Sequence, residues 1–174
     1  MMAPGPLAGL TLRGHERDVA SVPVDTVGQI HRAIMAGSWP IFSTGPVGVG
    51  KTCAALCLAD SWSLPPVVYS TVADAQRAVF ENPKAFWDRW VGLASRGRQG
   101  AGLAILDELG MRGKVSDARY DLVHRLIDSR HGMPLVAISN LSLSALADVY
   151  DDRIASRLAA GVVIRMTGRD RRIR

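Results

Sequence analysis

Cysteine, aromatic residues and long apolar runs are all scarce in this sequence of 174 residues. Its two cysteines, Cys53 and Cys57, are too few for a metal site on their own and give no sign of an oxidising compartment, so we interpret them as small core residues. No apolar stretch approaches the ~20 residues that a membrane-spanning helix needs. The start of the chain lacks the basic segment and apolar run of a secretory signal. We therefore expect a soluble, cytoplasmic protein that does not enter a membrane.

Lysine is also rare, so arginine carries almost all of the positive charge. Lys and Arg together number 21 against 16 Asp and Glu, which gives a net charge of +5, and the only lysines are Lys51, Lys84 and Lys114. A basic surface attracts phosphates, including those of nucleic acids, but does not define a binding site. The arginine bias is equally expected from a GC-rich genome. Hydrophobic residues make up 48% of the chain, enough for the packed core of a single domain.

Short apolar runs alternate with segments of helical periodicity along most of the chain. We predict strands at 40–44, 67–70, 103–106, 134–139 and 162–166. Helices are predicted at 27–36, capped by Asp25 or Thr26, and at 51–62, 73–81, 83–94, 117–130, 143–150 and 152–159. This alternation predicts an α/β fold in which helices flank both faces of a parallel sheet. The Pro- and Gly-rich residues 1–22 are predicted to form a flexible N-terminal arm, and 23–174 a single domain.

A glycine-rich segment between a predicted strand and a predicted helix matches the phosphate-binding pattern GxxxxGK[ST] in full. Its residues are Gly45, Pro46, Val47, Gly48, Val49, Gly50, Lys51 and Thr52. The glycines let the backbone curl until its N–H groups point at phosphates, and the start of the helix adds a positive dipole end. Lys51 is expected to reach the β- and γ-phosphates of ATP and Thr52 to ligate Mg²⁺, with Cys53 next in the ATP-binding set. The alternative is a chance glycine loop, which does not explain the strand and helix around it.

Two carboxylates, Asp107 and Glu108, directly follow the apolar strand 103–106. This arrangement has the form of a Walker B motif, in which Asp107 would hold Mg²⁺ and Glu108 would orient and deprotonate the attacking water. Two solvated acids at a strand end are the alternative. Asn140 follows the strand 134–139 and is expected to reach the γ-phosphate or the attacking water; a cap of the next helix is the competing interpretation.

The segment 151–158 carries the most specific resemblance to a known protein family. Its sequence DDRIASRL resembles the R-x-x-S-R-L segment of the DnaC/IstB branch of AAA+ ATPases, which comprises helicase loaders and transposition helper ATPases. Four further segments are similar to that branch, and the resemblance covers 26–172. They are LDELG at 106–110, SRH at 129–131, AISNL at 137–141 and GRDRR at 168–172, the last with Arg where Tyr is usual.

The resemblance implies an AAA+ P-loop NTPase core, placed at 23–174, and roles for several polar residues. Asn140 takes the sensor-1 place, Arg157 would be the arginine finger inserted into a neighbour's ATP site, and Arg153 would support it. Arg172 would be a sensor-2-like contact within the same subunit. For each arginine a solvated surface charge is the alternative. The chain departs from the family in its short segment before the core, where a helicase-docking region is usual, and in having no substantial C-terminal lid.

These features together predict an ATPase that acts in DNA replication as a helicase-loader-like factor, with ATP and Mg²⁺ as cofactors. By resemblance its partner would be a replicative helicase or, for a transposition helper of the IstB type, a transposase, and the ATP-bound form would be a homo-oligomer. Single-stranded DNA is a further expected ligand. The candidate residues for contact with its phosphates are Arg96, Arg98, Arg112 and Lys114; the alternative is that they are solvated surface charges. A nucleoside or nucleotide kinase and a non-catalytic, ATP-gated adaptor are the alternatives.

Overall fold

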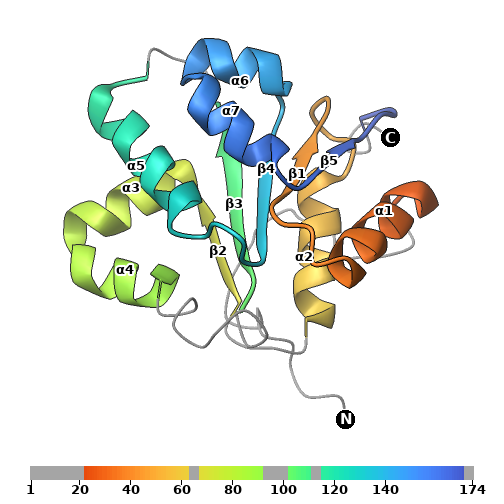
Figure 1. Ribbon diagram of the computed structural model, residues 1–174, viewed down its shortest axis with the longest axis horizontal. Helices are drawn as coiled ribbons and strands as arrows, with labels where there is room; N and C mark the ends of the chain where they lie inside the picture. Colours follow the sequence, from red (N-terminus) through yellow and green to blue (C-terminus); the bar gives the residue numbers. More distant parts are fainter. Residues whose placement is uncertain (1–21, 63–66, 92–101, 111–114, 171–174) are drawn as a thin grey trace.

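A parallel β-sheet of five strands forms the centre of the molecule (Figure 1). The computed structural model describes residues 22–62, 67–91, 102–110 and 115–170. The strands lie in the order β2-β3-β4-β1-β5, and every neighbouring pair is parallel. Their bounds are β1 (Ile41–Thr44), β2 (Val68–Thr71), β3 (Ala104–Leu109), β4 (Leu135–Ser139) and β5 (Val162–Arg165). The predicted α/β class and the parallel sheet are confirmed.

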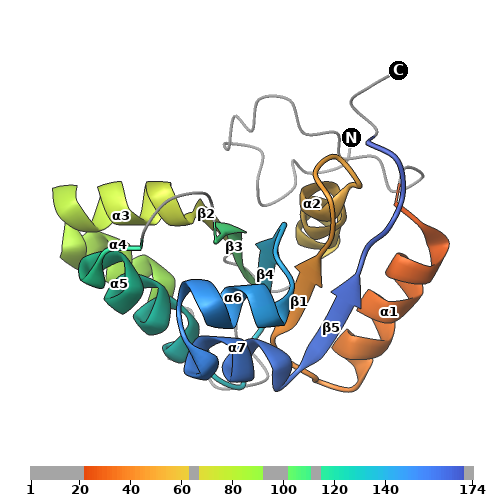
Figure 2. The ribbon, with the colours of Figure 1, turned by 90° about the horizontal axis from the view of Figure 1, so that it is seen from above.

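Seven helices flank the sheet within the described residues; α1 precedes the first strand, and the other six lie between strands in the chain. They are α1 (Val24–Met35), α2 (Lys51–Ser61), α3 (Val72–Glu81), α4 (Pro83–Val91), α5 (Asp117–Asp128), α6 (Leu143–Val149) and α7 (Asp152–Ala159). In Figure 2, α1 and α2 lie on one side, α5, α6 and α7 lie on the other, and α3 and α4 extend beyond β2. No helix of the described residues is both long and apolar enough to cross a membrane.

Each central strand is buried on both faces because its side chains alternate between two hydrophobic clusters. Ile41 of β1 packs with α1 and α2, whereas the next residue, Phe42, packs with α3 to α7. The same alternation runs along β3, where Ile105 faces the first cluster and Leu106 the second. Strands buried on both faces read as continuous apolar runs, which is why the sequence pattern located them.

Side-chain caps start five of the helices, but not the one for which a cap was predicted. The residues Thr71, Asn82, Ser116, Ser142 and Asp151 each accept a hydrogen bond from the backbone N–H three residues later, at the starts of α3, α4, α5, α6 and α7. The predicted cap of α1 by Asp25 or Thr26 is wrong. That helix begins earlier, at Val24, and Pro23 precedes it without a side-chain cap. Proline supports this start because its fixed φ suits the entry to a helix.

The strand β3 is longer than the sequence pattern suggested. The predicted strand ended at 106, whereas β3 continues through Asp107 and Glu108 to Leu109. Its pairing with β4 shifts register between Leu106 and Leu109, so that Leu109 again lies opposite Ser139. An irregularity of this kind re-aims side chains without ending a strand. The acidic pair therefore sits within the sheet edge and not in a loop after it.

A buried arginine ties together the beginnings of β3 and β4. Nη2 of Arg130 donates to the carbonyl oxygens of Gly102 at 2.5 Å and Pro134 at 2.6 Å, and the residue is 1% exposed. Its Nε and Nη1 make no hydrogen bond with the described part of the chain. Burial lowers the pKa of Arg130 to about 10, so the guanidinium still carries its charge at neutral pH. It lies at the edge of the sheet where these strands begin.

The turn into β5 yields a test of packing in the sheet. A Cβ at Gly161 would lie 2.1 Å from the carbonyl oxygen of Pro40, which accepts the N–H of Val162. We expect Gly161→Ala to lower the free energy of unfolding by about 1–3 kcal/mol, as overpacking against a fixed backbone does. Urea unfolding measures it. The matched control is Gly28→Ala within α1, where the nearest atom is 3.5 Å away; it should raise stability by roughly 0.5–1 kcal/mol. Equal effects of the two changes would contradict the packing argument.

Candidate nucleotide-binding site

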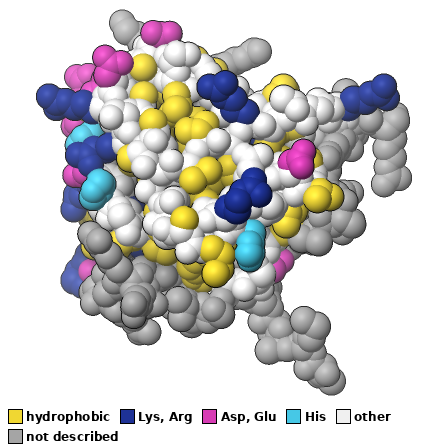
Figure 3. Space-filling view, turned by 45° about the vertical axis from the view of Figure 1, so that its right-hand side comes forward, with side chains coloured by type: hydrophobic (Ala, Val, Ile, Leu, Met, Phe, Trp, Pro, Cys, Tyr) yellow, Lys and Arg dark blue, Asp and Glu magenta, His cyan; other side chains and the backbone are white. Residues whose placement is uncertain are grey.

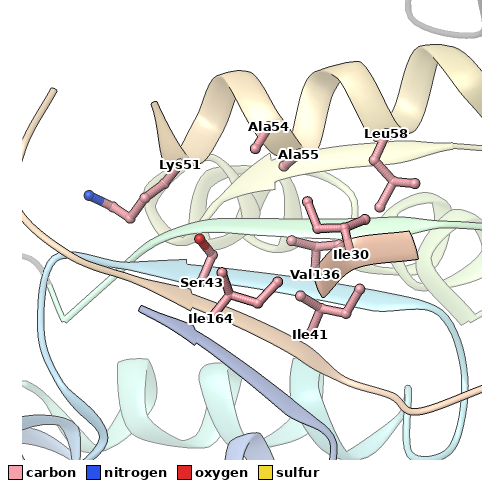
Figure 4. Close-up of a pocket in the computed structure, with 9 residues that line it drawn as sticks. All are labelled: Ile30, Ile41, Ser43, Lys51, Ala54, Ala55, Leu58, Val136 and Ile164. Atoms are coloured by element: carbon pink, nitrogen blue, oxygen red, sulfur yellow. The ribbon is translucent and has the colours of Figure 1, made fainter. Parts of the chain in front are cut away.

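The glycine-rich segment forms the turn from β1 into α2 at the carboxyl edge of the sheet. Lys51 is the first residue of α2, and its ammonium points away from the aliphatic side chains of Ala54 and Leu58 in the same helix (Figure 4). The cavity beside those side chains, which Ile30 and Ile164 also line, has a volume of about 10 Å³. That is room for about one water molecule, so this cavity belongs to the core and not to a ligand site.

The loop closes around the Lys51 ammonium. Its Nζ donates to the carbonyl oxygens of Gly45 at 2.7 Å and Pro46 at 2.6 Å, and the residue is only 6% exposed. Gly50, directly before it, is in the left-handed conformation with φ 100° and lets the chain enter α2. The curled backbone and the helix start together make the type of concave, positively polarised turn that binds phosphate groups.

The chain that follows β5 lies directly against this loop. A Cβ on Gly45 would fall 2.0 Å from the carbonyl oxygen of Met166, and a Cβ on Gly48 would fall 1.7 Å from Oδ1 of Asp170. Both glycines also have positive φ, 149° and 79°. Backbone conformation favours glycine at both positions, and at Gly45 the fixed backbone of Met166 also leaves no room for a side chain.

Asp107 is the polar centre of the site. Its Oδ2 accepts hydrogen bonds from Oγ1 of Thr52 at 2.8 Å and from the hydroxyl of Tyr69 at 2.9 Å. Its Oδ1 accepts the backbone N–H of Glu108 at 2.7 Å, and the residue is 5% exposed. Burial and the neighbouring Asp107 raise the pKa of Tyr69 above its usual range, so this hydroxyl remains a donor at neutral pH. The structure thus brings Thr52 and Asp107, 55 residues apart in the chain, into contact.

A hydroxyl and a carboxylate side by side suit Mg²⁺, which prefers oxygen ligands. In phosphate-bound sites this ion takes one or two carboxylates and completes its octahedron with water and phosphate oxygens. No group of three or more His, Cys, Asp or Glu residues that could hold a metal occurs among the described residues. The donor set therefore fits Mg²⁺ that arrives with a nucleotide and does not fit an ion held by the protein alone.

Glu108 has an unusual backbone. Its φ of 61° is the only positive value of a non-glycine residue in the described part of the chain. Such a conformation costs of order 1–3 kcal/mol and is found mainly at functional sites. It turns the exposed Glu108 side chain away from the regular alternation of β3, next to the buried Asp107. Strain at this position is consistent with the catalytic role predicted for Glu108, which remains a prediction.

Asn140 lies at the same edge of the sheet as the phosphate-binding loop. It directly follows β4, whose last residue, Ser139, is opposite Thr44 of β1. Asn140 is exposed, and the cap of the next helix is Ser142. The helix-cap interpretation of Asn140 is therefore wrong, whereas its predicted reach to the γ-phosphate remains a prediction.

The predicted arginine finger is engaged within its own subunit. Arg157, in the last turn of α7, forms an ion pair with Asp128 at the end of α5, and the two side chains are 35% and 45% exposed. Arg153, one turn earlier, is exposed. Arg172 lies outside the described residues, as do the candidate DNA-binding residues Arg96, Arg98, Arg112 and Lys114.

The cysteines agree with the sequence interpretation, and one site residue was missed. Cys53 is buried and Cys57 half-buried in α2, and the two do not form a disulfide. Tyr69 was not predicted as part of the site, because its proximity to Asp107 follows from the pairing of β2 with β3. The strand order was the missing information. Thr71 pairs with Asp107 across the two strands, and Tyr69 lies two residues before Thr71 on the same face of the sheet. With this pairing known, Tyr69 would have been a candidate site residue.

Comparison with known proteins places this geometry in a known fold. No protein-family model and no curated protein matches the sequence. Among solved structures, the DnaC helicase loader matches with a TM-score of 0.62 at 16% identity, over 90% of this chain and 96% of that one. DnaA from Aquifex aeolicus bound to AMPPCP matches with a TM-score of 0.61 at 22% identity, over 80% and 44%. The replication initiator DnaA bound to AMPPCP and single-stranded DNA matches with 0.64 at 21%, over 84% and 46%. The chain has the AAA+ fold.

This result confirms the predicted AAA+ core, with five parallel strands in the order β2-β3-β4-β1-β5 and helices on both faces. The resemblance to helicase loaders is thereby supported at the level of structure. The chain spans less than half the length of these two DnaA structures but nearly all of the DnaC loader structure. At these identities the match defines the AAA+ fold, and the chemistry has to be argued from the site.

The contact between Gly48 and Asp170 can be tested by a double-mutant cycle. We expect Gly48→Ala to destabilise the protein because it adds both left-handed strain and a clash with the Asp170 carboxylate. Adding Asp170→Ala should remove the clash but not the strain, with a coupling of about 1 kcal/mol or more in urea unfolding. The matched control is Gly37→Ala, where φ is 61° and no atom lies within 4 Å. It should be additive with Asp170→Ala; additivity in both cycles would contradict the contact.

Proposed function

We propose that this protein is an ATPase that binds ATP with Mg²⁺ at residues 45–52 and hydrolyses the γ-phosphate. The observation that carries the proposal is the 2.8 Å hydrogen bond from Thr52 to Asp107. This hydrogen bond joins α2, which follows the complete GxxxxGKT segment, to β3, which carries the acidic pair. The Aquifex aeolicus DnaA of similar fold is bound to the ATP analogue AMPPCP, which supports the same ligand here.

Each residue then has a role that its position permits. The loop N–H groups and the Lys51 ammonium bind the phosphates, with Nζ exchanging loop carbonyl oxygens for phosphate oxygens. Thr52 and Asp107 hold Mg²⁺, which neutralises charge on the phosphates. Glu108, exposed beside them, orients and deprotonates the attacking water, and Asn140 hydrogen-bonds the γ-phosphate or this water. Cys53 is buried in α2, two residues after Lys51, and packs in the hydrophobic cluster that contains Ile41.

The biological role that we propose is that of a helicase-loader-like factor in DNA replication. Its support is the match to the DnaC helicase loader over nearly the full length of both chains, together with the SRL segment of α7. A replicative helicase is then the partner. A transposition helper whose partner is a transposase remains the alternative, since the same sequence segments resemble both.

Single-stranded DNA is a further proposed ligand, on the basis of net charge and of the DNA-bound DnaA of similar fold. On the face shown in Figure 3, Lys and Arg side chains are dispersed among polar and apolar groups and form no single basic patch of described residues. The residues that we propose for this contact, Arg96, Arg98, Arg112 and Lys114, lie outside the described residues. Binding of this kind would weaken steeply with salt.

An arginine finger acts only when two subunits associate, and the ion pair between Arg157 and Asp128 does not prevent Arg157 from acting in this way. Half-exposed pairs such as Arg157 and Asp128 contribute only about 0–1 kcal/mol. Arg157 can therefore leave Asp128 at little cost when a neighbour's triphosphate offers a stronger partner. We propose that the ATP-bound protein is a homo-oligomer in which Arg157 completes the adjacent site.

The ATPase proposal is tested by two variants with different expected defects. Glu108→Gln should bind ATP like wild type yet hydrolyse it at least tenfold more slowly, because the water loses its base while Asp107 is unchanged. Lys51→Ala should lose tight binding itself. Binding is measured by calorimetry with ATP and Mg²⁺, and products by thin-layer chromatography. Unchanged hydrolysis in Glu108→Gln would place the base elsewhere, and a phosphorylated nucleoside in place of free phosphate would favour the kinase.

The role of Arg157 is tested by complementation between inactive variants. Arg157→Ala should bind ATP normally but lose multimer-dependent turnover, by a factor of order 10³–10⁵ if the finger acts as in other nucleotide hydrolases. Mixing it with Lys51→Ala should restore activity, because one variant supplies the finger and the other the ATP site. Arg77→Ala, which breaks an exposed ion pair with Asp74, is the control and should behave like wild type. Activity linear in protein concentration and no rescue on mixing would exclude a site shared between subunits.

A further inference from the structure

Three donors fix the Asp107 carboxylate, and one of them comes from outside the phosphate-binding loop and the acidic strand. Thr52 and the backbone of Glu108 belong to those two segments, but the Tyr69 hydroxyl reaches the carboxylate from β2, at 2.9 Å from Oδ2. The same oxygen accepts the Thr52 hydroxyl at 2.8 Å. Nothing in the GxxxxGKT or acidic-strand patterns requires a tyrosine here.

We propose that Tyr69 is a positioning residue of the metal site, whose hydroxyl holds Asp107 in the orientation in which it presents an oxygen to Mg²⁺ beside Thr52. The inference rests on the proposed ATPase function and deepens it. Tyr69 acts through Asp107 and is not expected to contact ATP. Groups that orient a metal ligand in this way typically change metal affinity by about 10–100-fold when they are removed.

The fold explains why this residue can hold a carboxylate so firmly. Tyr69 lies opposite Ile105 in the β2–β3 pairing, and Thr71 lies opposite Asp107, so Tyr69 projects from the same face of the sheet as Asp107. Its side chain packs against the hydrophobic cluster under α2, with Ile105 and Val67. A tyrosine with a packed ring and a polar tip has few rotamers, and its hydroxyl is therefore held in place by the core.

If the Tyr69 hydroxyl only stabilised the fold, its removal would have a different measurable effect. Without the hydroxyl, Asp107 keeps two of its three hydrogen bonds, so some loss of stability is expected from the lost hydrogen bond alone. That cost would appear equally with and without metal. A positioning role predicts in addition a defect confined to conditions in which Mg²⁺ is required, which stability measurements in EDTA do not detect.

The test is the Mg²⁺ dependence of ATP binding by the full chain. A fluorescent ATP analogue is titrated in EDTA and at a series of Mg²⁺ concentrations with wild type and Tyr69→Phe. We expect about a tenfold rise in the Mg²⁺ concentration at half-maximal binding, with affinity in EDTA unchanged. The matched control is Tyr120→Phe, which also removes a tyrosine–aspartate hydrogen bond, 2.5 Å from Asp151, at the start of α7. Its Mg²⁺ dependence should equal that of wild type.

A second comparison tests whether Tyr69 acts through Asp107. In an Asp107→Asn background, Tyr69→Phe should produce no further shift in Mg²⁺ dependence; an equal further shift would overturn the proposal. So would an unchanged Mg²⁺ dependence in Tyr69→Phe, an equal loss of affinity in EDTA, or a Tyr69→Phe protein whose thermal unfolding in EDTA shows no folded state. If wild type itself shows no Mg²⁺-dependent binding, the proposed ATPase function fails, and the inference about Tyr69 fails with it.

Discussion

Burial of the Asp107 carboxylate is the constraint on which the site depends. A carboxylate that is 5% exposed is costly unless hydrogen bonds replace the water around it. Three donors do so here, from α2, from β2 and from the backbone of β3. Satisfying this one group therefore requires that β2 lie next to β3 and that α2 begin close to the acidic strand. The same requirement places the glycine-rich loop next to Asp107, the residue that we propose as a metal ligand.

The position of β1 in the sheet explains what else surrounds the loop. Because β1 lies between β4 and β5, Asn140 follows one neighbouring strand and Asp170 lies beyond the other. The chain leaves β1 toward α2 on one face and leaves β4 toward α6 on the opposite face. Ligands of open α/β sheets bind where connections diverge in this way. Strand order therefore places the glycine-rich loop at the position in the sheet where such ligands bind.

Electrostatics divides the arginines into two kinds. Arg130 is buried at the edge where β3 and β4 begin and has a structural role, since it donates to the backbone carbonyls of Gly102 and Pro134. Arg157 is half-exposed and pairs with Asp128. An ion pair in contact with water is weak, so Arg157 remains available for a stronger anion, whereas Arg130 does not. This difference in burial is compatible with the arginine-finger role proposed for Arg157 and excludes such a role for Arg130.

The sequence by itself determined the elements and the loop, because both depend on local chemistry. Runs of apolar residues located all five strands, and glycines followed by Lys51, between a predicted strand and a predicted helix, predicted a phosphate-binding turn. Tertiary structure alone decided which strands are neighbours, and with them the hydrogen bond from Tyr69 to Asp107 and the contact of Asp170 with Gly48. It also decided the extension of β3 past Glu108 and the pairing of Arg157 with Asp128. These contacts join residues far apart in sequence, and a periodicity of two or 3.6 residues carries no information about them.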